Sequence, residues 1–208
     1  FKSYLAAILN ISPDHLERHG SIRNYIKAKF KLIKTQTKKD FTFLNTNNLF
    51  IKRYLSGQRI LSKIIKINKT VQSKVLKKID NSNFLSDGNK ENLSFVFEIA
   101  KKMKISKNNL FKVLQKFNGL DFRQQVIFKS KNLIIINDSK ATSFSSTVSI
   151  LRSITNVYWI VGGQAKKGDK FLLNKSECKN MEAYIFGKNK KFFINKLKKK
   201  INNKLFND

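Results

Sequence analysis

Short apolar runs that end in polar or glycine residues and are followed by helical patterns constrain the fold of this chain most strongly. Tyr4–Asn10 is one such run, and it ends at Ser12-Pro13-Asp14. Val157–Val161 is another, and it ends at Gly162-Gly163. A continuous apolar run of this length is typical of a strand buried on both faces. Strands that alternate with helices, with glycines at strand ends, predict an open α/β sheet whose functional groups lie at the carboxyl ends of the strands.

The other elements follow from periodicity and from breaker residues. Ser21 is a candidate N-cap for a helix whose apolar stripe runs to Ile33. Asn118-Gly119 marks a turn, and we expect a domain boundary there, with domains at 1–119 and 120–208. We also predict strands at Phe41–Leu44, Ile60–Lys69, Val71–Ile79 and Ala183–Phe186, and a hairpin of Gln124–Lys129 and Asn132–Ile136. One further helix is expected to end near Leu55, and others are expected to span Asn92–Met103, Lys107–Phe117, Ser143–Ile154 and Lys188–Ile201.

The net charge of +30 points first to a nucleic acid or another polyanion as a partner. The lysines, however, are spread along nearly the whole length and accompany abundant Asn, Ile and Phe. No ordered repeat places aromatic residues between basic ones. We therefore interpret the charge as residue bias at solvated positions and expect no nucleic-acid partner, with a basic nucleic-acid-binding protein as the alternative.

The single cysteine, Cys178, excludes an intramolecular disulfide within this sequence and fits a reducing compartment. No run of about 18 apolar residues is long enough to span a bilayer. The first residues resemble a buried strand rather than a signal peptide. We expect a cytoplasmic protein with no membrane partner. Because the sequence opens on Phe1 without an initiator Met, we expect a fragment of a longer protein.

Asp14–His19 follows the first apolar run and contains both histidines of the chain. A zinc-protease motif needs Glu directly after the first His, whereas Glu17 comes two places after His15. No third His or second Cys completes a zinc site. A His after a strand is otherwise a hydrogen-bonded structural residue or a ligand of another metal, and the residues alone leave both possibilities open.

Leu133–Thr142 (LIIINDSKAT) is an apolar strand that ends in a polar cluster before a predicted helix. Asp and Ser are ordinary turn formers, so a solvated turn is one interpretation. The position at a strand end favours a nucleotide or substrate site instead. Gly163–Asp169 only partly imitates a phosphate loop, because Asp169 and Lys170 stand where Lys and Ser or Thr are required.

Three strings resemble the Mur ligase family. Ile8–Ile33 is similar to the central-domain segment in which a strand-end histidine and a carbamylated lysine hold magnesium. Leu133–Thr142, with Arg123 upstream, resembles the start of the C-terminal domain in the members that add D-glutamate. Ile160–Asp169 resembles the family's GGxxKxxD segment. The resemblance implies an α/β protein with part of a Mur ligase central (ATPase) domain followed by a Rossmann-like C-terminal ligase domain.

The resemblance also implies roles in holding the cofactors. His15 and Lys29 become catalytic metal ligands, and a carbamate on Lys29 would replace a repelling ammonium group with the oxygen donors that Mg²⁺ prefers. In the alternative interpretation Lys29 is one more solvated lysine. Arg123 is assigned to the ATP phosphates and Asp138 to the ribose, since a guanidinium suits phosphate oxygens and a carboxylate suits paired hydroxyls.

Further residues inherit roles from the same resemblance. Asn89 and Asn92 match two asparagines near the adenine and ribose of ATP. Lys140 and Thr142 are assigned to the reacting centre and the incoming amino acid, and Lys166 to a carboxylate of D-glutamate. The chain departs from the family at three positions, where Gly88 and Phe122 replace a common His and Ser143 replaces a common Asn.

The activity that the resemblance implies is ATP-dependent addition of D-glutamate to UDP-N-acetylmuramoyl-L-alanine, through an acyl phosphate, in peptidoglycan precursor synthesis. We expect a monomer. The sequence contains neither the family's UDP-sugar domain nor its P-loop, and it stops before the family's final segment. We therefore expect no measurable ligase activity from this chain alone, with a non-catalytic scaffold as a further alternative.

Overall fold

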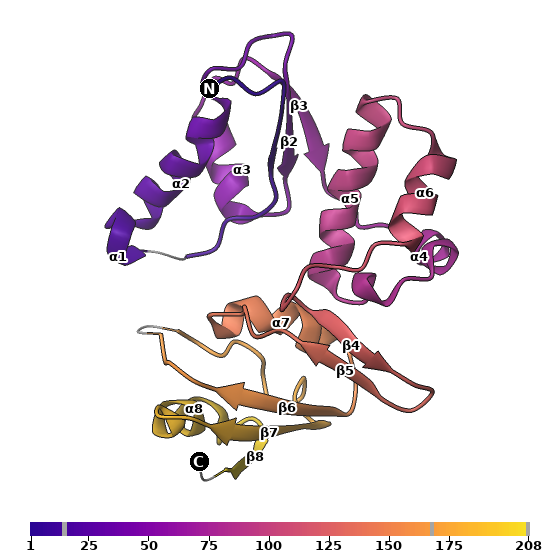
Figure 1. The fold of residues 1–208 in the computed structure, drawn as a ribbon. Coiled ribbons are helices and arrows are strands. Elements are labelled where there is room, and N and C mark those ends of the chain that lie inside the picture. The colour runs from indigo at the N-terminus through magenta and orange to yellow at the C-terminus, as the bar shows by residue number, and fades with distance from the viewer. Residues whose placement is uncertain (14–15, 167–168, 207–208) are drawn as a thin grey trace. The chain divides into compact units, whose positions relative to one another are not determined.

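The computed structural model describes residues 1–13, 16–166 and 169–206 (Figure 1). The chain divides into two compact units. The first unit comprises Phe1–Gln72 and Glu91–Leu110, and the second comprises Ser73–Lys90 and Phe111–Asp208. Residues 73–90 thus group with the C-terminal half of the chain. The domain division expected at Asn118-Gly119 comes from the sequence and stays a prediction.

The first unit is built on a parallel sheet in the order β1-β2-β3, made by Leu5–Ile8, Phe41–Asn45 and Lys63–Ile67. Every residue of β2 is buried, as expected for a central strand with both faces covered. Gln36, which is also buried, donates hydrogen bonds from Nε2 to the carbonyls of Ser3 and Phe41 at 3.0 and 3.1 Å. These bonds satisfy backbone acceptors beside β1 and β2.

Helices of the first unit begin where the sequence provides caps. Ser21 Oγ accepts a hydrogen bond from the Asn24 N–H at 3.2 Å and starts α2, as predicted. Asn48 caps α3 in the same way through the Ile51 N–H at 3.2 Å. The elements outside the sheet are α1 (Leu16–His19), α2 (Ile22–Phe30), η1 (Lys31–Ile33), α3 (Leu49–Ser56), most of α5 (Asp87–Lys102) and the start of α6 (Lys107–Gln115).

The second unit contains two sheets. An antiparallel hairpin joins β4 (Gln125–Lys129) to β5 (Ile134–Asn137), and a parallel sheet has the order β6-β7-β8. The parallel strands are Val157–Gly162, Met181–Phe186 and Asn202–Leu205. The helical elements that lie wholly in this unit are α4 (Ser73–Ile79), η2 (Ser82–Phe84), α7 (Phe144–Ser153) and α8 (Lys190–Leu197).

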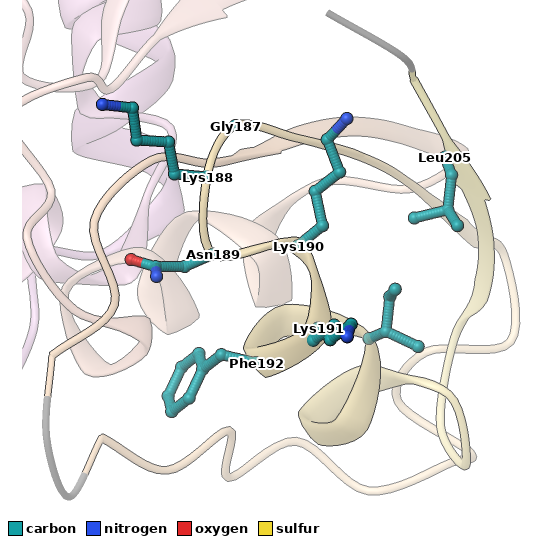
Figure 2. Close-up of a pocket in the computed structure, with 8 residues that line it drawn as sticks. Gly187, Lys188, Asn189, Lys190, Lys191, Phe192 and Leu205 are labelled. Carbon is teal, nitrogen blue, oxygen red and sulfur yellow. The ribbon is translucent and has the colours of Figure 1, made fainter.

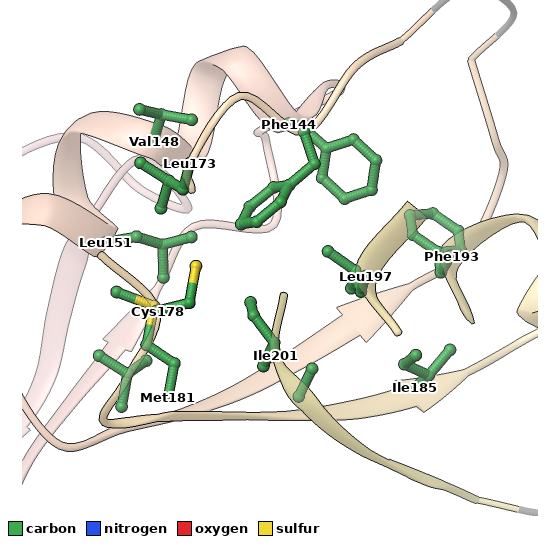
Figure 3. Close-up of a cluster of buried hydrophobic side chains, with 13 residues drawn as sticks. Phe144, Val148, Leu151, Leu173, Cys178, Met181, Ile185, Phe193, Leu197 and Ile201 are labelled. Carbon is green, nitrogen blue, oxygen red and sulfur yellow. The ribbon is translucent and has the colours of Figure 1, made fainter. Parts of the chain in front are cut away.

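The core of the second unit forms around Phe144, the first residue of α7 (Figure 3). Its ring meets Phe171 and Phe193 edge-on, with centroids 5.4 and 5.7 Å apart, and Trp159 at 6.1 Å. Edge-to-face pairs at these distances add to the free energy gained by burial. The core therefore fixes the start of α7, directly after the polar cluster at the end of β5.

The predicted α/β class is confirmed, and most predicted elements form, but one is wrong. Val71–Ile79 contains the helix α4 rather than a strand. Val75, Leu76 and Ile79 are the protected residues of this segment, with Ile79 buried, and their spacing matches one face of a helix. That packing overrides the strand preference of β-branched residues. Three short elements, α1, η2 and the polar strand β8, were not predicted. No helix in the described part of the chain has the length and apolar character needed to cross a membrane.

Candidate functional site

The second unit brings the turn that carries Arg123 against the polar cluster at the end of β5. The Gln124 N–H donates to Asp138 Oδ1 at 3.0 Å, and the Lys140 N–H donates to the Phe122 carbonyl at 3.0 Å. The hairpin register, in which Gln125 lies opposite Asn137, places the two segments side by side. Arg123, Asp138 and Lys140, which were predicted as site residues from separate strings, therefore lie in one place.

The Asp138 carboxylate has only one of its oxygens engaged by the described residues. Oδ1 accepts the Gln124 N–H, whereas Oδ2 is buried and has no hydrogen-bond partner in the part of the chain that the structure describes. Burial raises the pKa of Asp138, and the Gln124 N–H and the positive charge of Arg123 oppose that rise. A buried acceptor without a partner is costly, so Oδ2 is a position where a ligand hydroxyl would gain a full hydrogen bond.

The cationic side chains at this turn are exposed to solvent. Arg123 lies between Phe122 and Gln124, whose φ angles of 63° and 48° place both in the left-handed region. The Lys140 ammonium nitrogen lies 5.5 Å from the centre of the Phe122 ring, close enough for a cation–π contact. Thr142 is exposed just before α7. The turn presents one guanidinium and one ammonium group beside a carboxylate, which suits a ligand that carries both phosphates and hydroxyls.

The loop after β6, which contains Lys166, is attached to the start of α7. Asp169 Oδ2 accepts the Phe144 N–H at 2.7 Å, and the Asp169 N–H donates to the Lys166 carbonyl at 3.2 Å. A carboxylate at a helix N-terminus accepts a backbone N–H that has no partner within the helix, and it interacts favourably with the partial positive charge at that end. This explains Asp169 as a helix cap, a role that the sequence did not reveal, and it links the Lys166 loop to the helix that follows Thr142.

The two asparagines predicted to lie near adenine both lie on α5. The Asn89 N–H donates to Ser86 Oγ at 3.1 Å, and its side-chain Nδ2 donates to the Asn83 carbonyl at 2.7 Å. Asn92 is exposed three residues further along the helix. Gly88 fits tightly, since a Cβ there would lie 3.2 Å from Ser149 Oγ. These contacts are compatible with the predicted adenine role of Asn89 but do not test it.

The predicted metal site lies in the first unit. His15 lies outside the described residues. Lys29 is exposed on α2, and its Nζ is 5.2 Å from the centre of the Tyr25 ring. The Tyr25 ring in turn lies 5.1 Å from the His19 ring. Within residues 1–13, 16–166 and 169–206, no three His, Cys, Asp or Glu side chains gather closely enough to hold a metal ion. The described residues alone do not form a magnesium site.

A pocket that no sequence prediction included lies where β7 leads into α8 (Figure 2). The side chains of Lys188 and Lys190 project from the loop that follows Gly187. Asn189 Oδ1 accepts the Ala165 N–H at 2.8 Å, which attaches this loop to the one that carries Lys166. The remaining lining residues are Lys191, Phe192, Ile194 and Leu205.

Comparison with known proteins agrees with the resemblance seen in the strings. The chain is 29% identical over 93% of its length to the UDP-N-acetylmuramoylalanine--D-glutamate ligase of Rickettsia felis and spans 47% of that protein. It is 32% identical to the protein of the same name from Francisella tularensis subsp. novicida, over 93% of this chain and 46% of that one. The chain therefore spans about half the length of the curated relatives it matches.

Solved structures show the same fold at low sequence identity. The MurF ligase of Thermotoga maritima in complex with ADP matches with a TM-score of 0.69 and 12% identity, over 100% of this chain and 53% of that one. MurF from Acinetobacter baumannii matches with a TM-score of 0.67 and 15% identity, over 99% and 51%. Residues 1–115 match the Mur ligase middle domain. Since that match covers more than half of the 208 residues, the chain belongs to the Mur ligase family.

Proposed function

We propose that this chain is part of an ATP-dependent ligase that adds D-glutamate to UDP-N-acetylmuramoyl-L-alanine in peptidoglycan precursor synthesis. One observation carries the proposal: the turn with Arg123 is hydrogen-bonded to the DSKAT cluster, so the string that resembles D-glutamate-adding ligases forms one site. The relatives at 29% and 32% identity carry the name of that activity.

The described residues fit ATP. In this proposal the Asp138 Oδ2, buried and without a partner among the described residues, accepts a ribose hydroxyl, and the exposed Arg123 guanidinium pairs with phosphate oxygens. Asn89 and Asn92 contact the adenine and ribose. ATP, when bound, supplies the phosphoryl group that activates the alanine carboxylate. The residues of this chain orient the nucleotide and neutralise its charge, which is most of what a protein contributes to phosphoryl transfer.

The D-glutamate side of the proposal rests on the residues around the start of α7. Lys140 lies at the reacting centre, Thr142 contacts the incoming amino acid, and Lys166 pairs with a D-glutamate carboxylate. The cap that Asp169 places on α7 supports this grouping, because it holds the Lys166 loop next to the helix that follows Thr142. Two ammonium groups that pair with one small dicarboxylate give both binding energy and orientation.

The metal assignment remains a separate part of the proposal. Lys29, carried by α2, is proposed to become a carbamate and to bind Mg²⁺ together with His15. Its exposed position leaves the side-chain nitrogen accessible to CO₂, which reacts with the deprotonated amine to form the new N–C bond and releases a proton to solvent. We further propose that the protein is a cytoplasmic monomer and that 1–119 and 120–208 belong to the ATP-binding and glutamate-ligating domains.

The test is to join this chain to the parts of the Rickettsia felis relative that precede and follow the matched segment, and to measure phosphate release from the joined protein. With Mg²⁺, ATP and UDP-N-acetylmuramoyl-L-alanine, we expect turnover that depends on D-glutamate and is absent with L-alanine or D-alanyl-D-alanine. A Lys140→Met variant of the joined protein should lose about 100-fold in kcat.

The chain alone should give no turnover in the same assay. Circular dichroism of the joined protein provides the control that it is folded. Turnover of a folded joined protein with D-alanyl-D-alanine in place of D-glutamate would refute the assignment.

A further inference from the structure

Gln124 makes hydrogen bonds to three segments that the proposed function assigns to ATP or to the helix beside it. Its backbone N–H donates to Asp138 Oδ1 at 3.0 Å. Its side-chain oxygen accepts a hydrogen bond from the Ser86 hydroxyl, and its Nε2 donates to Ser149 Oγ at 3.4 Å. Ser86 precedes α5, Ser149 lies on α7 and Asp138 follows β5. All four residues belong to the second unit.

Ser86 relays this contact to the proposed adenine residue. Its hydroxyl donates its proton to Gln124 while its oxygen accepts the Asn89 N–H at 3.1 Å. Ser86 is 1% exposed, so water does not compete for either bond. Because the Ser86 hydroxyl donates its only proton to Gln124, a lone pair of its oxygen remains available to accept the Asn89 N–H at the start of α5. Gln124 thus sets the geometry of the cap in which Asn89 takes part.

The start of α5 is held on α7 by a second contact and by close packing. The Asp87 N–H donates to Ser153 Oγ at 3.0 Å, and the Ser153 hydroxyl donates to the Ser149 carbonyl at 2.7 Å. At Gly88 there is no room for a larger residue unless Ser149 moves, since a Cβ would lie 3.2 Å from its Oγ. Where the family commonly has His, this chain has Gly88 and a polar contact between Gln124 and Ser149.

Gln124 also stabilises the strained backbone of the turn that contains Arg123. A non-glycine residue at φ 48° is strained by about 1 kcal/mol or more, and Phe122 on the other side of Arg123 is in the same region. Such a backbone persists only where surrounding contacts over-determine it. Hydrogen bonds from both the backbone and the side chain of Gln124 supply those contacts.

We propose that Gln124 is a positioning residue that holds the Arg123 turn, Asp138 and the start of α5 in one arrangement for nucleotide binding. The proposal rests on the proposed function, because Arg123, Asp138 and Asn89 are the groups assigned to ATP. A single glutamine then coordinates groups that come from three separate elements of the fold.

The first test measures amide hydrogen exchange on the chain itself. In Gln124→Met, which keeps the length of the side chain but removes its hydrogen bonds, exchange at the Asn89 amide should quicken about five-fold, as for loss of one hydrogen bond of ordinary net strength. Gln124→Glu keeps an acceptor for the Ser86 hydroxyl and should restore slow exchange at Asn89. Gln115→Ala is the matched control, because its exposed side chain donates only to the Lys78 carbonyl among the bonds described.

The second test measures kinetics in the joined protein described above. Gln124→Met should raise KM for ATP about ten-fold, with kcat changed less than two-fold and KM for D-glutamate unchanged, because it misplaces nucleotide groups and leaves the reacting centre intact. Gln124→Glu should recover most of the loss. An unchanged Asn89 exchange rate in Gln124→Met overturns the proposal, and so does faster exchange without a change in KM for ATP.

The two proposals fail in distinguishable ways. If the unaltered joined protein shows no D-glutamate-dependent turnover, the ligase assignment falls. The Asn89 exchange rates in the chain itself, together with ADP affinity measured by calorimetry, then decide whether Gln124 positions a nucleotide site.

Discussion

The proposed nucleotide site of the second unit and the proposed metal site of the first unit differ in how their side chains are held. In the second unit, hydrogen bonds tie the Arg123 turn to Asp138 and to Lys140. In the first unit, Lys29 is exposed and rests only against the Tyr25 ring among the contacts described. The groups of the proposed nucleotide site are therefore held by hydrogen bonds within this chain, whereas Lys29 would need a modification and a metal to become part of the proposed metal site.

Removing the core beneath the organised site should have the largest effect. Phe144→Ala deletes a ring that is 3% exposed and packs against four other aromatic rings, so we expect a loss of about 4 kcal/mol in the free energy of unfolding. Urea unfolding followed by the fluorescence of Trp159, the single tryptophan, measures it. Phe128→Ala, at a ring 49% exposed, is the control and should cost less than about 1 kcal/mol. Equal losses would mean that the site does not rest on this core.

Removal of the guanidinium tests the organised site directly. Arg123→Ala in the joined protein should lower kcat/KM for ATP about 100-fold, because a charge-assisted contact to phosphate is lost. The control is Arg152→Ala, which removes a surface ion pair with Glu177 at 2.8 Å and should leave kinetics unchanged. Similar kinetics for the two variants would place the phosphates elsewhere.

The activity that depends on Lys29 in the proposed metal site should require CO₂. Lys29→Ala should reduce turnover of the joined protein at least about ten-fold, since a metal ligand is lost. Nuclear magnetic resonance with ¹³CO₂ should detect a carbamate signal that disappears in this variant and persists in Lys27→Ala, a neighbouring exposed lysine on the same helix. Full activity in CO₂-depleted buffer would argue against the carbamate.

The smallest expected effect concerns the stability that the folded protein loses by burying the charged Asp138 carboxylate. Because burial raises the pKa of Asp138 in the folded state, the folded protein loses stability as the pH rises through that pKa. Asp138→Asn removes the charge and should stabilise the protein by about 1 kcal/mol at pH 7. The gain should shrink as the pH falls towards about 4, where the unfolded carboxyl also takes up a proton. Urea unfolding across this pH range checks it, with Asp121→Asn, at an exposed carboxylate, as the control.

Most of the fold could be predicted because the informative residues act locally. The apolar runs at β1, β2 and β6 specify strands, and Ser21 specifies a helix start through its own side chain. Burial on both faces holds for β2 but not for β6, where Tyr158 and Ile160 are exposed. The helix α4 was mistaken for a strand because β-branched residues and lysines blur the period, and only packing on Ile79 decides between the two. The strand β8 is polar and forms because β7 offers it a partner.

The site was predictable to the extent that its residues occur in recognisable strings. Asp138 and Lys140 follow the carboxyl end of β5, where α/β sheets place their functional groups. Arg123 precedes β4, and the antiparallel hairpin brings it to the same end. The roles of Gln124 and Asp169 were missed for a different reason. The Gln124 side chain bonds to Ser86 and Ser149, which lie 38 residues before and 25 residues after it, and Asp169 bonds to Phe144, which lies 25 residues before it. The residues adjacent to each of them in the sequence do not mark these roles.

The left-handed backbone at residues 122 and 124 has a consequence for which substitutions the chain can accept during evolution. Glycine would relieve the backbone at either position, and asparagine is the side-chain-bearing residue best suited to this conformation. Position 122 is thus free to drift towards either. Position 124 is not, because a residue shorter than glutamine would no longer span from the turn to both serines. Deep mutational scanning should find that glycine and asparagine are accepted at 122 but not at 124.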